Sequence, residues 1–275
     1  MSSGWDLVRG RRAHFGDDVE AYDFGRPGYP DRVYELLQQH CGLGRGTRVL
    51  EIGPGTGQAT GRLLGAGAAV HAVELNEALA ARLRAKFAGA DLAITVAPFE
   101  SATLPDAGFD LAVAATCFHW LPADVGIARC AAAVRPGGAI ALWWNFFGDP
   151  DRPDPFHEAL TEVLRAKAPE LLDGPRGFGD GVRPPHALDI EARVEEMCGS
   201  GHFVEPVHEV IAWTGRHTPA QLRALFASYS PWIALAQGRR EPLLDDLERL
   251  AHNAFGAVVE RPYLTPIYLA CRAAD

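Results

Sequence analysis

Apolar residues in the first half of the chain occur in short continuous runs and do not alternate with polar ones. Runs of this kind, bounded by glycine or polar residues, predict strands that are buried on both faces. The segments between them place apolar residues three and four positions apart, which is the spacing of one helix face. The predicted strands are 47–52, 69–73, 92–96, 109–115 and 139–144, and the predicted helices are 31–40, 59–64, 76–87 and 124–134.

This alternation predicts an α/β fold with a Rossmann-like, doubly wound, seven-stranded and mostly parallel sheet. In such a sheet, ligands bind outside the carboxyl ends of the strands. In the second half of the chain the alternation of strands and helices is less regular. Its Pro- and Gly-rich start predicts a lid inserted after the fifth strand, with a long loop over 169–185. Further helices are expected at 154–167, 218–229 and 241–253, and further strands at 203–213 and 264–271.

We expect one domain over 1–275, in four parts. These are an N-terminal cap segment (1–45), a core (46–147), a lid (148–200) and C-terminal strands and helices that complete the sheet (201–275). The cap segment is rich in aromatic residues, although Pro27 and Pro30 exclude a long helix there. A frayed leader rarely carries so many aromatics, so the segment is predicted to pack over a site. Asp31 is expected to be the N-cap of the helix that follows.

Composition narrows the functional classes. The net charge of −9 argues against a nucleic-acid partner, because phosphate binding favours a basic surface. The five cysteines contain no Cys-x-x-Cys pair, so neither a metal site nor a disulfide framework is expected. No apolar run is long enough to span a membrane, and no secretory signal is visible. We therefore expect a cytoplasmic monomer or homodimer that acts on a small molecule.

Three glycines at alternate positions follow the first strand: Gly53, Gly55 and Gly57. Glycine lets backbone approach a ligand closely, and the following helix start offers unpaired N–H groups. A dinucleotide fingerprint, G-x-G-x-x-G, would need a glycine at position 58, which is Gln58. An NAD(P)-dependent oxidoreductase is therefore the minor alternative, and the chain also has no Tyr-x-x-x-Lys pair.

The string from Glu51 to Gly57 instead resembles the first motif of class I S-adenosylmethionine-dependent methyltransferases. Glu74, which ends the second strand, matches the acid that binds the ribose hydroxyls in that family. Phe99 and Glu100 match the loop that flanks the adenine, and the Arg-Pro-Gly-Gly run at 135–138 matches a turn before the fifth strand. The resemblance implies S-adenosyl-L-methionine as cofactor and S-adenosyl-L-homocysteine as product.

Further motifs resemble one small-molecule subgroup, the type 11 or trans-aconitate methyltransferase-like enzymes. They are the run from Tyr22 to Pro30, Phe118-His119-Trp120, Trp144-Asn145 and the segment that ends in Ser228-Tyr229-Ser230. The cofactor residues implied by the resemblance are Tyr22, Arg26, Glu51, Gly53, Pro54, Gly55, Thr56, Gly57, Glu74, Leu75, Phe99, Glu100, Thr116, Cys117 and Phe118. The implied substrate residues are Tyr29, His119, Trp120, Trp144, Asn145 and Tyr229.

Methyl transfer from a sulfonium is an in-line displacement, so the protein mainly holds the acceptor, methyl group and sulfur in line. His119 is the candidate catalytic residue, because neutral imidazole can take a proton near pH 7. It can equally line the site without proton transfer. The prediction is methyl transfer to an oxygen, carboxylate or hydroxyl, of a small molecule. N-methylation and a non-catalytic cofactor-binding protein are the alternatives.

Overall fold

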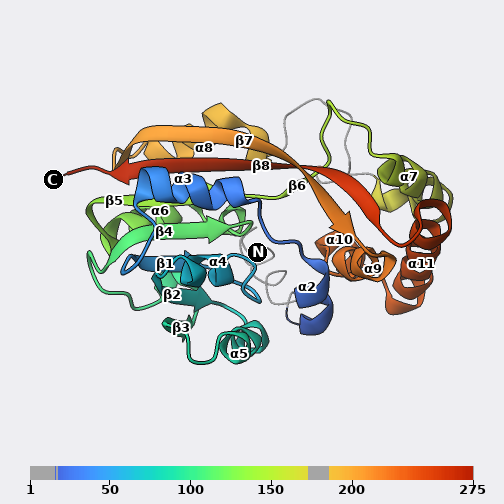
Figure 1. The fold of residues 1–275 in the computed structure, drawn as a ribbon, viewed down its shortest axis with the longest axis horizontal. Coiled ribbons are helices and arrows are strands. Elements are labelled where there is room, and N and C mark those ends of the chain that lie inside the picture. The colour runs from blue at the N-terminus through green and yellow to red at the C-terminus, as the bar shows by residue number, and fades with distance from the viewer. Residues whose placement is uncertain (1–15, 17, 173–185, 275) are drawn as a thin grey trace, which may run out of the picture.

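The computed structural model describes residues 16, 18–172 and 186–274. Its sheet has the order β3-β2-β1-β4-β5-β8-β6, with β7 paired to β8 on the other side (Figure 1). The first five strands pair in parallel, whereas β6, β7 and β8 pair antiparallel. The strands are β1 (Arg48–Ile52), β2 (Ala69–Glu74), β3 (Leu92–Val96), β4 (Phe109–Ala115), β5 (Val134–Trp143), β6 (Phe146–Phe147), β7 (Phe203–His217) and β8 (Val259–Arg272).

The predicted α/β class and mostly parallel sheet are confirmed, with eight strands in place of the expected seven. The additional strand β6 has two residues and pairs with β8 just beyond the β5 pairing, so it continues β5 after a break. The break contains Trp144 and Asn145, two of the predicted site residues. The predicted turn at 135–138 lies within β5, which contains Gly137 at φ 68°.

Helices cover both faces of the sheet. One face packs against α3 (Asp31–Cys41) and α4 (Thr60–Gly65), and the other against α6 (Ala123–Ala133) and α8 (Ile190–Cys198). Adjacent residues of one strand pack on opposite faces of the sheet. Val49 belongs to the apolar cluster on the α3 and α4 face, and Leu50 to the cluster on the α6 and α8 face. Burial on both sides explains why the strands read as unbroken apolar runs. The α5 helix (Glu77–Lys86) lies at the β3 end.

A third apolar cluster lies beyond the sheet, at one end of the long β7–β8 ribbon (Figure 1). We call it the cap cluster, and its helices are α7 (Pro155–Lys167), α9 (Pro219–Ala227), α10 (Ser230–Ile233) and α11 (Gln237–Leu250). Thr218 caps α9 in a reciprocal capping box with Gln221, as a predicted helix start there requires. The sequence did not predict α8 or α10, and the part of the expected loop at 173–185 lies outside the described residues.

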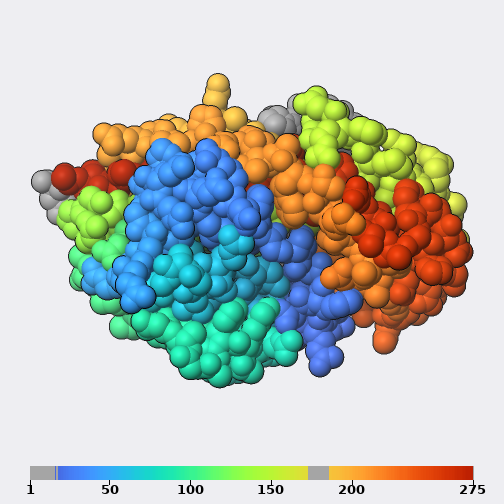
Figure 2. Space-filling view, viewed as in Figure 1, coloured from blue at the N-terminus to red at the C-terminus, as the bar shows by residue number. Residues whose placement is uncertain are grey.

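The N-terminal segment joins the sheet to the cap cluster. A short helix, α2 (Val19–Gly25), is followed by an extended stretch to Pro30, and we call residues 19–30 the strap. Figure 2 shows the strap between the core and the orange and red helices of the C-terminal half. Gly25 packs so closely on α9 that a Cβ would come 2.3 Å from the Leu225 nitrogen. Asp31 is not an N-cap: Pro30 holds that position, and Asp31 pairs with Arg62.

Candidate active site

The glycine turn after β1 is built on backbone conformations that suit glycine. Gly53, Gly55 and Gly57 have φ angles of 58°, 60° and 92°, in the left-handed region. Each also lies against a different neighbour. A Cβ on Gly53 would come 3.0 Å from Cys117, and one on Gly55 would come 3.2 Å from the Tyr22 ring. The turn therefore has no side chain at these three positions, and its backbone is enclosed by the segment after β4 and by the strap.

Glu74 lies at the carboxyl end of β2 and faces this turn. Its Oε2 accepts a hydrogen bond from the Gly55 N–H at 3.0 Å, and its Oε1 accepts from the Asn76 N–H at 2.9 Å. The side chain is only 6% exposed, and burial raises the pKa of its carboxyl, against the opposing effect of the backbone donors. Each carboxylate oxygen keeps a further lone pair, so two more donors can be accepted here.

Glu51 lies within the sheet beside the turn and is 1% exposed. Its Oε2 accepts from the Thr60 hydroxyl at 2.7 Å, which ties β1 to α4. Its Oε1 is buried and has no hydrogen-bond partner among the described residues. Burial raises the pKa of Glu51 to about 7, with the nearby Glu74 adding to the effect and Thr60 opposing it.

The segment after β4 supplies the predicted residues 116–120. Thr116 has φ 59°, and its hydroxyl contacts the Tyr29 hydroxyl at 2.9 Å. The Cys117 thiol donates to the Ile52 carbonyl at 2.9 Å, so it holds β4 against β1. Phe118 is 1% exposed and belongs to the core, where its ring lies against Gly126. Its side chain therefore serves packing.

His119 and Trp144 meet between the ends of β4 and β5. The Trp144 indole N–H donates to His119 Nδ1 at 3.1 Å. Trp144 is 4% exposed and contacts the rings of Tyr268 and His186, at 6.1 and 6.0 Å between centroids. Trp120 lies beside His119, with ring centroids 5.0 Å apart. The fold therefore brings the predicted site residues His119, Trp120 and Trp144 together.

The strap closes over the turn through charged and aromatic contacts. Asp23 accepts from Arg82 at 2.7 Å and from Lys86 at 2.7 Å, both on α5. It also interacts with the Thr56 hydroxyl. These donors hold the pKa of Asp23 below its usual range despite its partial burial. Thr56 thus fastens the strap to the turn.

Arg26 fastens the other end of the strap to the cap cluster. Its Nε donates to the Ser228 hydroxyl at 2.8 Å and its Nη2 to the Ser228 carbonyl at 2.9 Å. Its guanidinium lies over the Tyr22 and Tyr229 rings, 5.2 and 5.0 Å from the centroids. The residues predicted from the strap and from the C-terminal half therefore form one layer above the glycine turn.

Asn145 is the centre of a hydrogen-bond network. Its Nδ2 donates to the Gly28 carbonyl at 2.9 Å, and its Oδ1 accepts from the Thr265 hydroxyl at 2.8 Å. The Trp213 indole N–H in turn donates to Thr265 at 2.8 Å. This chain of contacts couples the strap to β5, β8 and β7.

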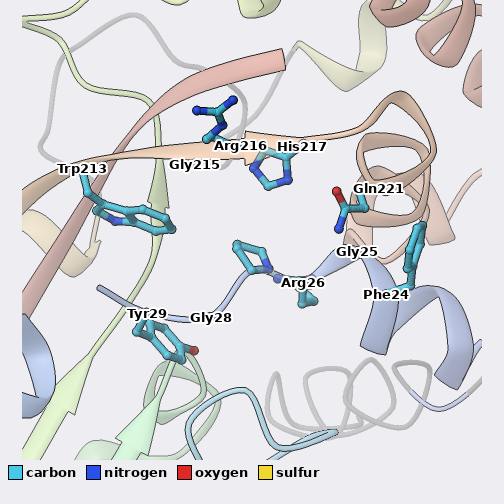
Figure 3. Close-up of a pocket in the computed structure, with 11 residues that line it drawn as sticks. Phe24, Gly25, Arg26, Gly28, Tyr29, Trp213, Gly215, Arg216, His217 and Gln221 are labelled. Carbon is cyan, nitrogen blue, oxygen red and sulfur yellow. The ribbon is translucent and has the colours of Figure 1, made fainter. Parts of the chain in front are cut away.

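A pocket of about 300 Å³ lies between the strap and the end of β7 (Figure 3). Trp213 and His217 extend from β7 into it, whereas Arg216 points away. His217 is 4% exposed and contacts the Tyr263 hydroxyl at 2.7 Å, and burial lowers its pKa to about 4. The strap contributes Arg26 and Tyr29, but the glycine turn contributes nothing to the lining. The pocket therefore lies on the side of the strap away from the turn.

The remaining predicted residues flank the turn on the β3 side. Phe99 is 4% exposed in the core, and the Arg129 guanidinium lies 5.6 Å from its ring centroid. Leu75 and Glu100 are half-buried, and Pro54 is buried in the turn. Sequence reasoning missed several residues that complete the site: Asp23, Arg82, Lys86, His186, Trp213 and Thr265. Asp23 lies within the motif run from Tyr22 to Pro30 but was not singled out there. The other five belong to no local motif, so only their three-dimensional contacts identify them.

The fold and the site define an enzyme of the class that binds a nucleotide-like cofactor at a glycine turn. A family model described as a methyltransferase domain matches residues 49–138. An uncharacterized methyltransferase of Mycobacterium tuberculosis is 34% identical over 236 residues, which cover 86% of this chain and 84% of that protein. The chain belongs to the class I S-adenosylmethionine-dependent methyltransferases, and S-adenosylmethionine is the cofactor of this family.

Other relatives agree with this family and fold. An uncharacterized methyltransferase of Schizosaccharomyces pombe is 27% identical over 237 residues, with 86% of each chain covered. The phosphoethanolamine N-methyltransferase 2 of Haemonchus contortus, solved with phosphomonomethylethanolamine and S-adenosylhomocysteine, matches with a TM-score of 0.56 at 16% identity. That match covers 99% of this chain and 61% of the nematode chain, and it shows the shared fold. No helix in the described part of the chain is long and apolar enough to span a membrane.

Proposed function

We propose that this methyltransferase transfers the methyl group of S-adenosylmethionine to an oxygen atom of a small molecule. The observation that carries the cofactor placement is Glu74, a buried carboxylate at the end of β2 that faces Gly55 and retains lone pairs. A carboxylate in this position suits two neighbouring ribose hydroxyls, which would donate to its two oxygens. The left-handed backbone of Gly53 and Gly55, which carries no Cβ, would let the methionine part approach closely beside Glu51.

Glu51 supports this placement through its buried Oε1. An acceptor atom without a partner in the interior is costly, and a donor from a bound molecule removes that cost. The methionine ammonium group supplies such donors. Phe99 and Glu100, after β3, would flank the adenine, in line with their place on the β3 side of the turn. Bound cofactor supplies an activated methyl group, and the protein supplies orientation and exclusion of water.

The acceptor side is proposed to be the space bounded by the strap, His119, Trp120 and the Trp144-Asn145 break. Tyr29 and Asn145 both contact Thr116, so they hold the strap against the end of β4. Trp120 and Trp144 provide aromatic surface next to the His119 imidazole. Aromatic surface with a few polar groups is typical of sites for small organic molecules. The partner is thus a metabolite-sized acceptor.

A radiolabelled methyl-transfer assay over carboxylates, hydroxyl compounds and amines tests this proposal. We expect label transfer and equimolar S-adenosylhomocysteine with at least one oxygen acceptor. Transfer confined to amines would replace the oxygen acceptor by nitrogen. Tight cofactor binding with no transfer to any acceptor would instead favour a protein that binds the cofactor without catalysis.

A further inference from the structure

The pocket behind the strap has no role in the proposed methyl transfer, and we call it the rear pocket. It measures about 300 Å³, with residues 24–29 of the strap on one side and β7 and α9 on the other (Figure 3). His119, Trp120 and the Trp144-Asn145 break contribute nothing to its lining. A volume of this size is at the lower end for small-molecule sites, so it suits a single-ring compound.

Aromatic side chains lie at both ends of the rear pocket. Trp213 extends into it from β7, and Phe24 lies at the opposite end, on α2 (Figure 3). Phe24 is 54% exposed, a larger fraction than any other large apolar side chain in the described part of the chain. A ring that packs on Phe24 removes this apolar surface from water. The two ends therefore suit an aromatic ligand.

The side chains of the rear pocket offer hydrogen-bond donors and no carboxylate. Its charged lining residues are Arg26 and Arg216, and Arg216 points away. Arg26 donates to Ser228 and pairs with no carboxylate among the described residues. The Gln221 Oε1 already accepts from a backbone N–H at 2.9 Å, which leaves the amide nitrogen to donate. The rear pocket thus disfavours a cation and suits a ligand with an oxygen acceptor.

A buried chain of hydrogen bonds joins the two sides of the rear pocket. The Trp213 indole N–H donates to the Thr265 hydroxyl at 2.8 Å, and that hydroxyl donates to Asn145 at 2.8 Å. Asn145 then donates to the Gly28 carbonyl of the strap at 2.9 Å. The rear pocket is therefore held in shape by the protein's own contacts.

The strap is a wall that the rear pocket shares with the glycine turn. On the turn side, a Cβ on Gly55 would come 3.2 Å from the Tyr22 ring, so the strap covers the turn. On the other side, the strap supplies six of the eleven lining residues of the rear pocket. Both the rear pocket and the cover over the turn depend on the same strap position. A ligand bound on one side therefore stabilises the strap for the other.

We propose that the rear pocket binds a single-ring aromatic molecule with an oxygen acceptor, and that this ligand strengthens cofactor binding by holding the strap in place. The molecule is distinct from the methyl acceptor, because the strap separates the rear pocket from the turn. Binding in the rear pocket goes beyond the proposed function, and only the coupling rests on the proposed cofactor placement. By linkage, the cofactor strengthens ligand binding by the same factor.

Benzamide is the probe for the rear pocket, because it joins a planar ring to a carbonyl oxygen. In nitrogen-15-labelled protein, we expect benzamide to shift the indole N–H signal of Trp213, which is identified by its loss in Trp213→Phe. The signal of Trp232, buried in the cap cluster, should stay unchanged. We expect a Kd of about 1 mM. No shift of the Trp213 signal would overturn the proposal.

Two further compounds test the chemical class of the ligand. Cyclohexanecarboxamide keeps the amide without the planar ring and should bind about fivefold more weakly than benzamide. Benzylamine keeps the ring but carries a positive charge, so it should not bind beside Arg26. Equal binding of the three compounds would contradict the assigned class.

Two variants test the location. Phe24→Ala removes one aromatic end and should weaken benzamide binding about fivefold, whereas Val258→Ala, at a 40% exposed position outside the rear pocket, should not. Gly28→Leu adds a side chain where a Cβ meets open space, and it should abolish benzamide binding while the protein still unfolds cooperatively. Benzamide affinity unchanged in Phe24→Ala and in folded Gly28→Leu would place the ligand elsewhere.

Calorimetric titration of S-adenosylhomocysteine with and without saturating benzamide tests the coupling. We expect about fivefold tighter binding with benzamide, and the same factor for benzamide in the presence of S-adenosylhomocysteine. Competition between the two compounds, or no mutual effect, would contradict the proposal. Absent S-adenosylhomocysteine binding would instead defeat the proposed cofactor placement, while the benzamide shift at Trp213 would remain.

Discussion

The two sides of the site are built in different ways. On the proposed donor side, the contacts of the two carboxylates join residues that are close in sequence: Glu51 and Thr60 are nine positions apart, and Gly55 and Glu74 nineteen. On the proposed acceptor side, the contacts span the chain, since Asn145 is 117 positions from Gly28 and 120 from Thr265. The donor side uses backbone groups and strand ends, whereas the acceptor side uses side chains from several elements. We therefore expect cofactor binding and acceptor choice to be separable, so that changes on each side affect different quantities.

The largest expected effect is on the donor side, at Glu74. Glu74→Ala removes a buried carboxylate that faces the turn and should weaken S-adenosylhomocysteine binding by about 100-fold, since charge-assisted hydrogen bonds are among the strong ones. Calorimetric titration measures the change. Glu77→Ala, on the exposed start of α5, is the control and should bind like wild type. Equal affinity in the two variants would remove Glu74 from the cofactor site.

Glu51 should make the stability of the donor side depend on pH. Its pKa rises from 4.5 to about 7 on folding, so the folded state binds the proton more tightly than the unfolded state. The free energy of unfolding should therefore fall as pH rises from about 4.5 to about 7, by about 3 kcal/mol at most.

Glu51→Gln should abolish this dependence. The variant should be more stable than wild type at pH 8 and similar to it below pH 4.5. Urea unfolding across this range measures the difference, with the exposed Glu35→Gln as control. A wild type whose stability rises through the same interval would contradict the assignment. If Glu51 also contacts the cofactor, the stabilised variant should bind it more weakly.

Gly55→Ala tests the backbone of the turn. An alanine at φ 60° costs about 1–2 kcal/mol, and its Cβ would press on the Tyr22 ring at 3.2 Å. We expect about tenfold weaker cofactor binding. Gly65→Ala, at the end of α4 with open space around it, should be neutral or slightly stabilising. Similar behaviour of both variants would show that the turn tolerates a side chain.

The smallest expected effect is at Arg26, which the resemblance assigns to the cofactor but which the strap ties to Ser228 beside the proposed acceptor space. Arg26→Lys cannot reproduce the two hydrogen bonds to Ser228 and should loosen the strap, at a cost of about 1 kcal/mol. We expect the KM for the acceptor to rise about fivefold with little change in kcat. The exposed Arg84→Lys on α5 serves as control. An effect on cofactor affinity alone would place Arg26 on the donor side and would contradict its proposed role beside the acceptor.

The same contrast explains what could be predicted from the sequence. The glycine turn, Glu74 and the first four parallel strands carry local patterns, so their positions were predicted closely. β5 begins at Val134, five residues before the predicted start, because it includes the predicted turn at 135–138. Trp144 and Asn145 were identified by motif, but the break that contains them and the strand β6 follow from pairing with β8. Asp23, Trp213 and Thr265 act through partners far along the chain. No spacing rule marks such residues, because folding alone brings them together.

The most direct test of the account is a comparative calorimetric titration of the wild-type chain with S-adenosylhomocysteine and with NAD. The glycine spacing and Glu74 predict saturable binding of S-adenosylhomocysteine at one site per chain and no binding of NAD. Binding of NAD, or no heat with S-adenosylhomocysteine, would contradict the cofactor site at the glycine turn.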